Sequence, residues 1–154
     1  MSTSRSAGAG ADEGGDALEQ FARGSLGAEI VAREIVSDER GAIEARLRGY
    51  CDGGGCDLVL TTGGTGVAPR DVTPEATLAV IEREVPGIAE AMRAASQPHT
   101  RHWMLSRGVA GIRGATLIVN FPGSPRSIPQ AGAAIADALP HALALIAGTT
   151  TSHA

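Results

Sequence analysis

The stretch DLVLTTGGTGVAPRDVTPEAT, residues 57–77, contains the signals that decide the fold. Its first six residues, DLVLTT, contain a short apolar run that stops at two threonines, and a glycine-rich turn follows at once. A run that is apolar on both faces is typical of a parallel strand covered on both sides. Thr73 as an N-cap, Pro74 at the first helical position and Glu75 then favour a helix start. The stretch therefore predicts a strand, a glycine loop and a helix.

The same alternation continues on both sides of this stretch and predicts the α/β class. We expect a three-layer α/β/α domain with a mostly parallel sheet. Asp38 reads as the cap of the helix that follows the first predicted strand. The expected strands cover residues 28–36, 57–62 and 116–121, and the expected helices cover residues 16–26, 39–50, 73–85 and 87–96, with a further helix from Ser127 that is interrupted at Pro140.

Composition fits one folded domain. The chain has 154 residues, of which 43% are hydrophobic and only 3% aromatic, so the core must be aliphatic. Residues 1–15 are small and polar, and we expect them to form a flexible segment before a domain at residues 16–150. The sequence predicts two ordinary thiols for Cys51 and Cys56, because no second Cys/His pair lies nearby.

Charge and hydropathy disfavour two classes of partner. The net charge is −4 and the arginines form no block, so we expect no nucleic-acid partner. No apolar run approaches the length of a membrane span, and the first 25 residues lack a signal core. The sequence therefore predicts a cytoplasmic protein without a membrane partner.

Two glycine loops follow predicted strands, at residues 63–66 and 122–125. Ligands of α/β sheets bind at the carboxyl ends of strands, so both loops belong to one edge and could form one pocket. Glycine lets backbone N–H groups approach an anion closely. The first loop has neither the Walker A sequence nor the dinucleotide spacing. It predicts another kind of anion or phosphate site; the alternative is a turn that only needs positive φ.

Two aspartates sharpen this expectation. Asp71 follows the first loop, beside Arg70, which could neutralise phosphate charge. A carboxylate next to a phosphate needs a bridging cation, and Mg²⁺ is usually held by one or two carboxylates together with phosphate oxygens. Asp38, at the end of another predicted strand, could supply the second carboxylate. Its alternative role is a plain helix cap.

Three segments carry a resemblance to a known family. TTGGTGVAPRDVTPEAT at residues 61–77, MLSRGVAGIRG at 104–114 and LIVNFPGSP at 117–125 resemble, in order, the motifs of the MogA/MoaB family of molybdenum-cofactor biosynthesis proteins. The resemblance covers roughly residues 16–148. It implies a three-layer α/β/α domain that assembles as a homotrimer.

The resemblance also implies an activity. The enzymatic family members are molybdopterin adenylyltransferases, which convert molybdopterin and ATP to adenylyl-molybdopterin and pyrophosphate with Mg²⁺. The family's two important aspartates fall on Asp71 and Asp38, as catalytic residues and Mg²⁺ ligands. Hand-off of the product to a molybdenum-insertion protein is implied as well. Because the nucleophile is an anionic phosphate oxygen, no general base is required, and positioning and charge neutralisation carry the reaction.

The remaining candidates line the two loops. Ser106 and Arg107 are candidates for gripping the pterin phosphate, or else a structural turn with a surface arginine. The phosphate or nucleotide cradle is expected from Thr62, Gly63, Gly64, Thr65, Gly66 and Arg70, and the second wall from Asn120, Pro122, Gly123, Ser124 and Pro125.

The sequence departs from the family pattern at its beginning. The family opens with an apolar strand that is missing here, and Thr3 and Gly14 stand where the family has Asp and Ser, while Asp12 and Gly15 match. The lost strand would leave buried N–H and C=O groups unpaired at about 1–3 kcal/mol each. We therefore expect the natural start to lie upstream of Met1.

The sequence leads to three hypotheses about the function of the chain. The first is molybdopterin adenylylation, and its rival is a MoaB-like protein that binds molybdopterin without efficient adenylyl transfer. The third is a truncated subunit that folds only inside an oligomer with another chain. Trp103, beside His102, reads as a core or trimer contact, with pterin stacking as the alternative.

Overall fold

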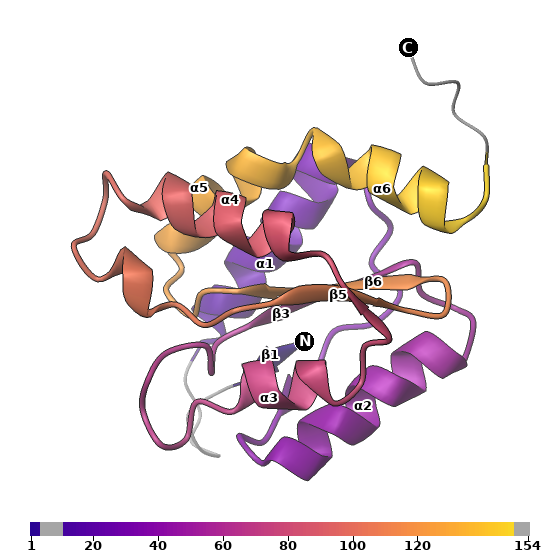
Figure 1. The fold of residues 1–154 in the computed structure, drawn as a ribbon, viewed down its shortest axis with the longest axis horizontal. Helices are drawn as coiled ribbons and strands as arrows, with labels where there is room; N and C mark the ends of the chain where they lie inside the picture. The colour runs from indigo at the N-terminus through magenta and orange to yellow at the C-terminus, as the bar shows by residue number, and fades with distance from the viewer. Residues whose placement is uncertain (4–10, 150–154) are drawn as a thin grey trace.

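A six-stranded sheet forms the centre of the molecule (Figure 1). The computed structural model describes residues 1–3 and 11–149, and of residues 2 and 3 only the backbone. The strands lie in the order β2-β1-β3-β6-β5-β4. Their bounds are β1 Ser2–Thr3, β2 Ile35–Val36, β3 Leu58–Thr62, β4 Arg83–Glu84, β5 Ala110–Arg113 and β6 Thr116–Phe121.

Helices cover both faces of this sheet, which makes three layers (Figure 1). One face carries α1, α4, α5 and α6, and the other carries α2 and α3 (Figure 1). The helices are α1 Glu13–Leu26, α2 Arg40–Asp52, α3 Thr73–Leu78, α4 Pro86–Ser96, α5 Ser127–Ile135 and α6 Ala138–Ile146, with a short 3₁₀ turn η1 at Trp103–Leu105. No helix in the described ranges is both long and apolar enough to cross a membrane.

The strand pairings combine parallel and antiparallel ladders. β1 pairs in parallel with β2 and β3, and β3 pairs in parallel with β6. β5 is antiparallel to both β4 and β6. The predicted α/β/α class is confirmed, with three parallel and two antiparallel pairings among the described residues. The parallel half contains the predicted strands, and their carboxyl ends lie at one edge.

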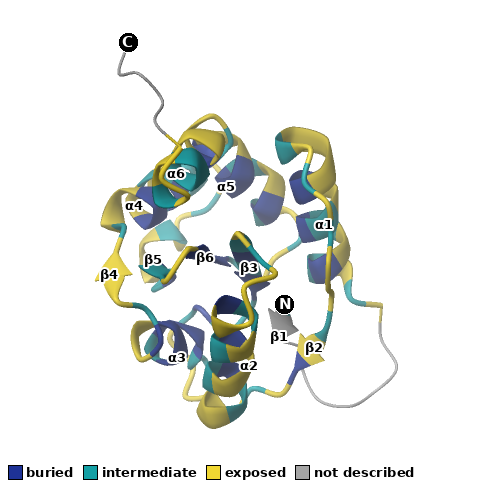
Figure 2. Ribbon diagram, turned by 90° about the vertical axis from the view of Figure 1, so that its right-hand side faces the viewer, coloured by how far each residue is buried: buried dark blue, intermediate teal, exposed yellow. Residues whose placement is uncertain are grey.

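The core consists of two apolar clusters, one on each face of the sheet (Figure 2). Phe21 of α1 and Phe121 of β6 lie in the larger cluster, with ring centroids 5.3 Å apart. Ile43 and Leu47 of α2 anchor the smaller one. β6 is buried along its whole length, which agrees with its apolar sequence.

The first strand position is filled for only two residues. β1 lies between β2 and β3, and among the described residues it pairs with β3 at Thr62. The expectation that the family's first strand is missing stays a prediction. Residues 28–34, expected in a strand, belong to none, and only Ile35–Val36 pair with β1. Residues 28–34 have no described neighbour to pair with, and a strand is defined by its hydrogen bonds to a neighbouring strand. This explains why the observed strand is shorter than the predicted one.

Several predicted helix boundaries were wrong. α1 begins at Glu13 with Asp12 as its cap, so it includes part of the segment expected to be flexible, whose residues 4–10 lie outside the description. The caps of α2 and α3 are Glu39 and Val72, and neither is Asp38 or Thr73 as predicted. Thr73 is helical, and its hydroxyl bonds Gly63 O instead of capping.

The predicted helix through residue 85 ends at Leu78, and β4 follows. Apolar spacing at Ile81 and Val85 was misleading, because these residues flank a strand paired with β5. The break in the last predicted helix lies before Pro140, between α5 and α6. Proline has no backbone N–H, so Pro140 cannot donate to the carbonyl of Ala136, four residues earlier. The helical hydrogen bonding is therefore interrupted there.

Candidate functional site

The two predicted glycine loops meet at the carboxyl edge of β3 and β6. Thr62 Oγ1 donates a hydrogen bond to Pro122 O at 2.8 Å. A Cβ on Gly123 would lie 3.1 Å from Gly63 Cα, so the two backbones are nearly in contact. The expectation that both loops share one edge is confirmed.

Positive φ shapes the first loop. Gly63 and Gly64 have φ angles of 92° and 66°, which L side chains rarely adopt. Thr73 ties this turn to α3, donating from Oγ1 to Gly63 O at 3.0 Å and from N–H to Gly64 O at 3.1 Å. Thr65 is buried and Gly66 half-buried, while Arg70 is exposed at the far end of the loop.

Asp71 closes the loop. Its Oδ2 accepts a hydrogen bond from Ala68 N–H at 2.9 Å, and its own N–H donates to Ala68 O at 2.9 Å. A Cβ on Gly66 would lie 2.7 Å from Asp71 Oδ2, so this position must be glycine for the carboxylate to sit there. Within the described residues, Asp71 Oδ1 makes no hydrogen bond. One carboxylate oxygen is thus fixed and the other is available to a ligand.

Arg107 clamps the same loop from the η1 side. Its guanidinium donates to Gly66 O and to Asp71 O, both at 2.7 Å, and pairs with Glu75 of α3. Its backbone N–H donates to Thr65 O at 2.8 Å. The Arg107 guanidinium lowers the pKa of Glu75 below its ordinary value. The structure therefore places Arg107 as a support of the loop, and a role of Arg107 toward the pterin phosphate stays a prediction.

Ser106 lines a small cavity beside the second loop. A cavity of about 120 Å³ lies between α4, η1 and the second loop, and Ser106, Asn120 and Pro122 are among its lining residues. His102 and Trp103 line it as well. Arg93 donates to Gly108 O at 3.0 Å and so fixes the segment that carries Ser106.

Asn120 is a buried structural residue at the end of β6. Its Nδ2 donates to Thr61 Oγ1 and Thr77 Oγ1, both at 3.0 Å, and its Oδ1 accepts from Val109 N–H. These bonds satisfy the whole amide. Asn120 thus ties β6 to β3, α3 and the segment before β5. In the second loop itself, Gly123 and Ser124 are exposed and Pro125 is half-buried.

The start of α1 forms a third side of the site. A Cβ on Gly14 would lie 3.3 Å from Thr62 Oγ1 and 3.6 Å from Gly123 O, so this helix end contacts both loops. Asp12 bonds Gly15 N–H at 3.0 Å and pairs with Arg33 at 3.1 Å. Thr3 has only its backbone described.

Arg33 joins three acids on the outer side of α1. It pairs with Asp16 at 2.7 Å and with Glu19 at 3.0 Å as well as with Asp12. Hydrogen bonds to Asp16 and Glu19 raise the pKa of Arg33. The network holds the N-terminal end of α1 in place. The sequence did not predict it, because the partners are up to 21 residues apart.

Asp38 follows β2, two residues beyond Val36, and is half-buried. It therefore comes at the carboxyl end of a parallel strand, as do both glycine loops. Within the described residues no group of three or more His, Cys, Asp or Glu side chains could hold a metal alone. Cys51 and Cys56 are both free thiols.

Sequence reasoning missed Glu75 and Arg93 as supports of the site. Glu75 reads as an ordinary first-turn acid, and Arg93 as a surface residue of α4. Each contacts a segment that is distant in sequence, so no local pattern could show the pairing.

The fold and this edge define a class: a three-layer α/β protein whose glycine-rich turns converge at the carboxyl ends of parallel strands. A family model described as a probable molybdopterin binding domain matches residues 1–141. The chain belongs to this family, as its motifs predicted.

Relatives and solved structures agree with this assignment. The chain is 50% identical over 115 residues to a molybdopterin adenylyltransferase of Helicobacter pylori J99, covering 75% of this chain and 65% of that protein. It is 43% identical over 139 residues to the molybdopterin adenylyltransferase of Escherichia coli K12, covering 90% of this chain and 71% of that protein. The crystal structure of the molybdopterin biosynthesis enzyme MoaB from Thermus thermophilus is 46% identical, with a TM-score of 0.83, and the match covers 92% of this chain and 89% of that one.

Proposed function

We propose that this chain adenylylates molybdopterin with ATP, releasing pyrophosphate, as a step of molybdenum-cofactor biosynthesis. The names of the Helicobacter and Escherichia relatives support this activity. The observation that carries it is the contact between the two glycine loops, with Asp71 beside the first one. That arrangement presents backbone N–H groups and a fixed carboxylate to a phosphorylated substrate.

The reaction is a phosphoryl transfer that needs positioning more than proton removal. A terminal phosphate oxygen of molybdopterin attacks the α-phosphorus of ATP. One P–O bond forms there, and the bond from the α-phosphorus to the bridging oxygen breaks, so that pyrophosphate leaves with its electron pair. The nucleophile is already an anion and requires no base.

The residues divide this work between them. The turn at Gly63 and Gly64 would bring N–H groups to the phosphates without Cβ interference. Arg107 would hold that turn in place through Gly66 O and Asp71 O. Arg70, exposed at the loop end, would neutralise phosphate charge. The second loop would close the opposite side, with Ser124 as a donor.

Asp71 and Asp38 fit a role as Mg²⁺ ligands. The open Oδ1 of Asp71 and the half-buried carboxylate of Asp38 are hard oxygen donors, which Mg²⁺ prefers. Bound Mg²⁺ would supply neutralisation of the triphosphate charge. The two carboxylates would orient the phosphates around it.

The test is a pair of matched variants. Asp71→Asn removes the negative charge but keeps the size of the side chain, and it should lower the rate of adenylyl-molybdopterin formation by about 100-fold or more. Asp137→Asn is the control, because Asp137 is exposed at the start of α6 and makes no capping bond. Equal rates in the two variants would contradict the role of Asp71. Circular dichroism checks that both variants fold.

A second candidate function is molybdopterin binding without efficient adenylyl transfer. One observation favours it: Gly14 faces Thr62 and Gly123 at a position where a side-chain donor could reach the loops, and glycine supplies none. Tight molybdopterin binding without ATP turnover would select this candidate.

Assembly and location are also proposals. We expect a homotrimer, and three exposed apolar side chains, Val67, Met104 and Leu105, offer contact surface near the site. Light scattering on the purified chain tests this and also the reading as a subunit that needs another chain. Hand-off of the product to a molybdenum-insertion protein and a cytoplasmic location remain predictions, as does the lack of a nucleic-acid partner.

A further inference from the structure

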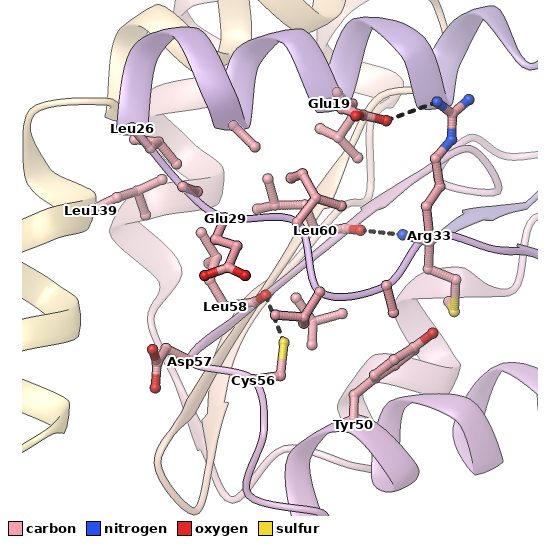
Figure 3. A pocket seen from close by; sticks show the side chains of 18 of the residues that line it. Glu19, Leu26, Glu29, Arg33, Tyr50, Cys56, Asp57, Leu58, Leu60 and Leu139 are labelled. Atoms are coloured by element: carbon pink, nitrogen blue, oxygen red, sulfur yellow. Dashed lines mark hydrogen bonds and ion pairs between the residues drawn. The ribbon is translucent and has the colours of Figure 1, made fainter.

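The cavity between α4, η1 and the second loop differs in charge from a larger cavity of the molecule. The larger one, of about 400 Å³, lies beside Met1, where we expect the family's first strand, so no ligand is assigned to it. Carboxylates of Glu19, Glu29 and Asp57 line it (Figure 3). The cavity of about 120 Å³ has Arg93 and no carboxylate among its described lining residues. We call it the Arg93 cavity.

Arg93 lies half-buried on α4 and has no acidic partner among the described residues. Its Nη1 donates to Gly108 O at 3.0 Å and lies 3.5 Å from Ser106 O. In the same part of the chain, its Nε and Nη2 make no hydrogen bond. The Arg93 cavity therefore contains a full positive charge with N–H donors that a phosphate oxygen can accept from.

Arg107, which also supports this edge, lacks such a free charge. Its guanidinium pairs with Glu75 and donates to Gly66 O and Asp71 O, so all three of its nitrogen atoms are engaged. The pairing with Glu75 already compensates its charge. Arg93 is therefore the better candidate for binding an anion next to the second loop.

Hydroxyl groups complete the lining of the Arg93 cavity. Ser96, Thr100, Ser106 and Ser127 all contribute to it. Within the described residues, the hydroxyls of Ser106 and Ser127 make no hydrogen bond. The volume of the cavity equals that of about four water molecules at roughly 30 Å³ each, which is enough for one phosphate group. Donors, charge and size thus fit a single phosphate.

The Arg93 cavity adjoins both glycine loops. Pro122 of the second loop lines it directly. The segment that carries Ser106 contacts the first loop, because the Arg107 N–H donates to Thr65 O at 2.8 Å. A phosphate in the cavity would therefore lie beside the second loop and would leave the first loop and Asp71 to the phosphates of ATP.

We propose that the Arg93 cavity is a phosphate subsite, in which the Arg93 guanidinium and the hydroxyls of Ser106 and Ser127 bind the terminal phosphate of molybdopterin. The assignment of this phosphate to molybdopterin rests on the proposed adenylyl transfer. Arg93 then binds the substrate directly and orients the attacking phosphate oxygen toward ATP on the first loop.

Trp103 provides the readout, because it is the one tryptophan of the chain and lines the cavity. Inorganic phosphate, added to the full chain at constant ionic strength, should change the Trp103 fluorescence saturably, and titration calorimetry measures the same affinity. Arg93→Gln should weaken phosphate binding by at least about tenfold, because it removes the charge.

Arg93→Lys separates charge from structure. Both Arg93 variants lose the guanidinium bond to Gly108 O, but lysine keeps the positive charge. Arg93→Lys should therefore bind phosphate at least about threefold more tightly than Arg93→Gln. Arg101→Gln is the control, because it removes the same charge from an exposed residue of the turn before η1, and its phosphate affinity should equal that of the unmodified chain.

Two results would overturn the subsite. One is the absence of saturable phosphate binding to the unmodified chain by either method. The other is equal phosphate affinity in Arg93→Gln and Arg93→Lys, since the residue would then act only through the backbone that it holds.

Kinetics test which substrate supplies the phosphate. Arg93→Gln should raise the KM for molybdopterin by at least about tenfold and leave the KM for ATP unchanged. A raised KM for ATP, or no change in either KM, would overturn the assignment to molybdopterin. The phosphate titration needs no turnover, so a chain that binds phosphate through Arg93 but forms no adenylyl-molybdopterin would refute the proposed function and leave the phosphate subsite standing.

Discussion

Arg107 is the residue that holds the first glycine loop in shape. It bonds two carbonyls of the loop and one acid of α3, a set that a planar guanidinium can satisfy and an ammonium cannot. From sequence, Ser106 and Arg107 were candidates for gripping the pterin phosphate, with a structural turn and a surface arginine as the alternative. The sequence could not decide between these roles, because the two carbonyls that the Arg107 guanidinium bonds lie 36 and 41 residues away along the chain.

We predict that Arg107→Lys raises the KM for ATP by about tenfold, because the loop loses the guanidinium bonds to Gly66 O and Asp71 O. The change in kcat should be smaller, since Asp71 keeps its bond to Ala68. Steady-state kinetics of product formation measures both. Arg101→Lys, at an exposed residue of the preceding turn, is the control. An unchanged KM in Arg107→Lys would show that the loop keeps its shape without the guanidinium bonds of Arg107.

Cys56 illustrates how burial changes reactivity. Desolvation raises the pKa values of both Cys51 and Cys56. Less thiolate is then present at a given pH, and the thiolate is the reactive form. We predict that at pH 8 iodoacetamide alkylates both thiols more slowly in the folded chain than in urea. Mass spectrometry over time measures the rates, and equal rates would contradict the burial.

The sign of the linked stability follows from the same shift. A raised pKa in the folded state contributes stability that is present below the pKa of the unfolded thiol. That contribution is lost as pH rises through the pKa of the folded thiol. The chain should therefore lose some stability above about pH 8.5, and less of it in a Cys51→Ala, Cys56→Ala variant.

At the scale of elements, glycines mark both loops and close contacts. Gly132 lies where α5 crosses α1, and a Cβ there would come within 2.5 Å of the Phe21 ring. That ring is buried against Phe121 and has little room to move. Gly24, in the exposed part of α1, has no atom within 4 Å of its would-be Cβ. Two helical glycines thus have opposite surroundings.

We predict opposite effects on stability for these two positions. Gly132→Ala should lower the free energy of unfolding by about 1–3 kcal/mol, because overpacking outweighs the better helix propensity. Gly24→Ala should raise it by up to about 1 kcal/mol. Urea unfolding measures both. Stabilisation by Gly132→Ala would mean that α1 and α5 are not packed as described.

The sequence was sufficient for β3 and β6 and insufficient for the other four described strands. Apolar runs predicted β3 and β6 almost to the residue, because buried parallel strands have continuous apolar sequences. β5 was missed because Gly111 and Gly114 resemble loop residues. The structure gives Gly111 another reason: a Cβ there would lie 2.7 Å from Arg83 O. Close approach of two strands requires glycine without any turn.

The site shows the same division. Both glycine loops, Asp71 and the shared edge could be predicted, because strand ends and glycine turns are local patterns. Asn120 was assigned to a wall, whereas its amide is consumed by Thr61, Thr77 and Val109. Such a network depends on three elements meeting, which only the tertiary structure shows.

For the whole molecule, the family fold brings the segments of the proposed reaction to one edge of the sheet. The chain spans about two thirds of the Helicobacter relatives that it matches, so activity must be measured on this chain itself. The start of α1 contacts both loops at Gly14 and forms the third side of the candidate site. No side chain is available there, because the residue is glycine. Activity of the whole chain tests whether these three segments suffice.

The most direct measurement is incubation of the purified chain with molybdopterin, ATP and Mg²⁺, followed by mass spectrometry of the pterin product. We expect a pterin heavier by one adenylyl group, formed together with pyrophosphate and only when ATP is present. Molybdopterin that binds the chain but is recovered without adenylylation would contradict the proposed adenylyl transfer and select the binding function instead.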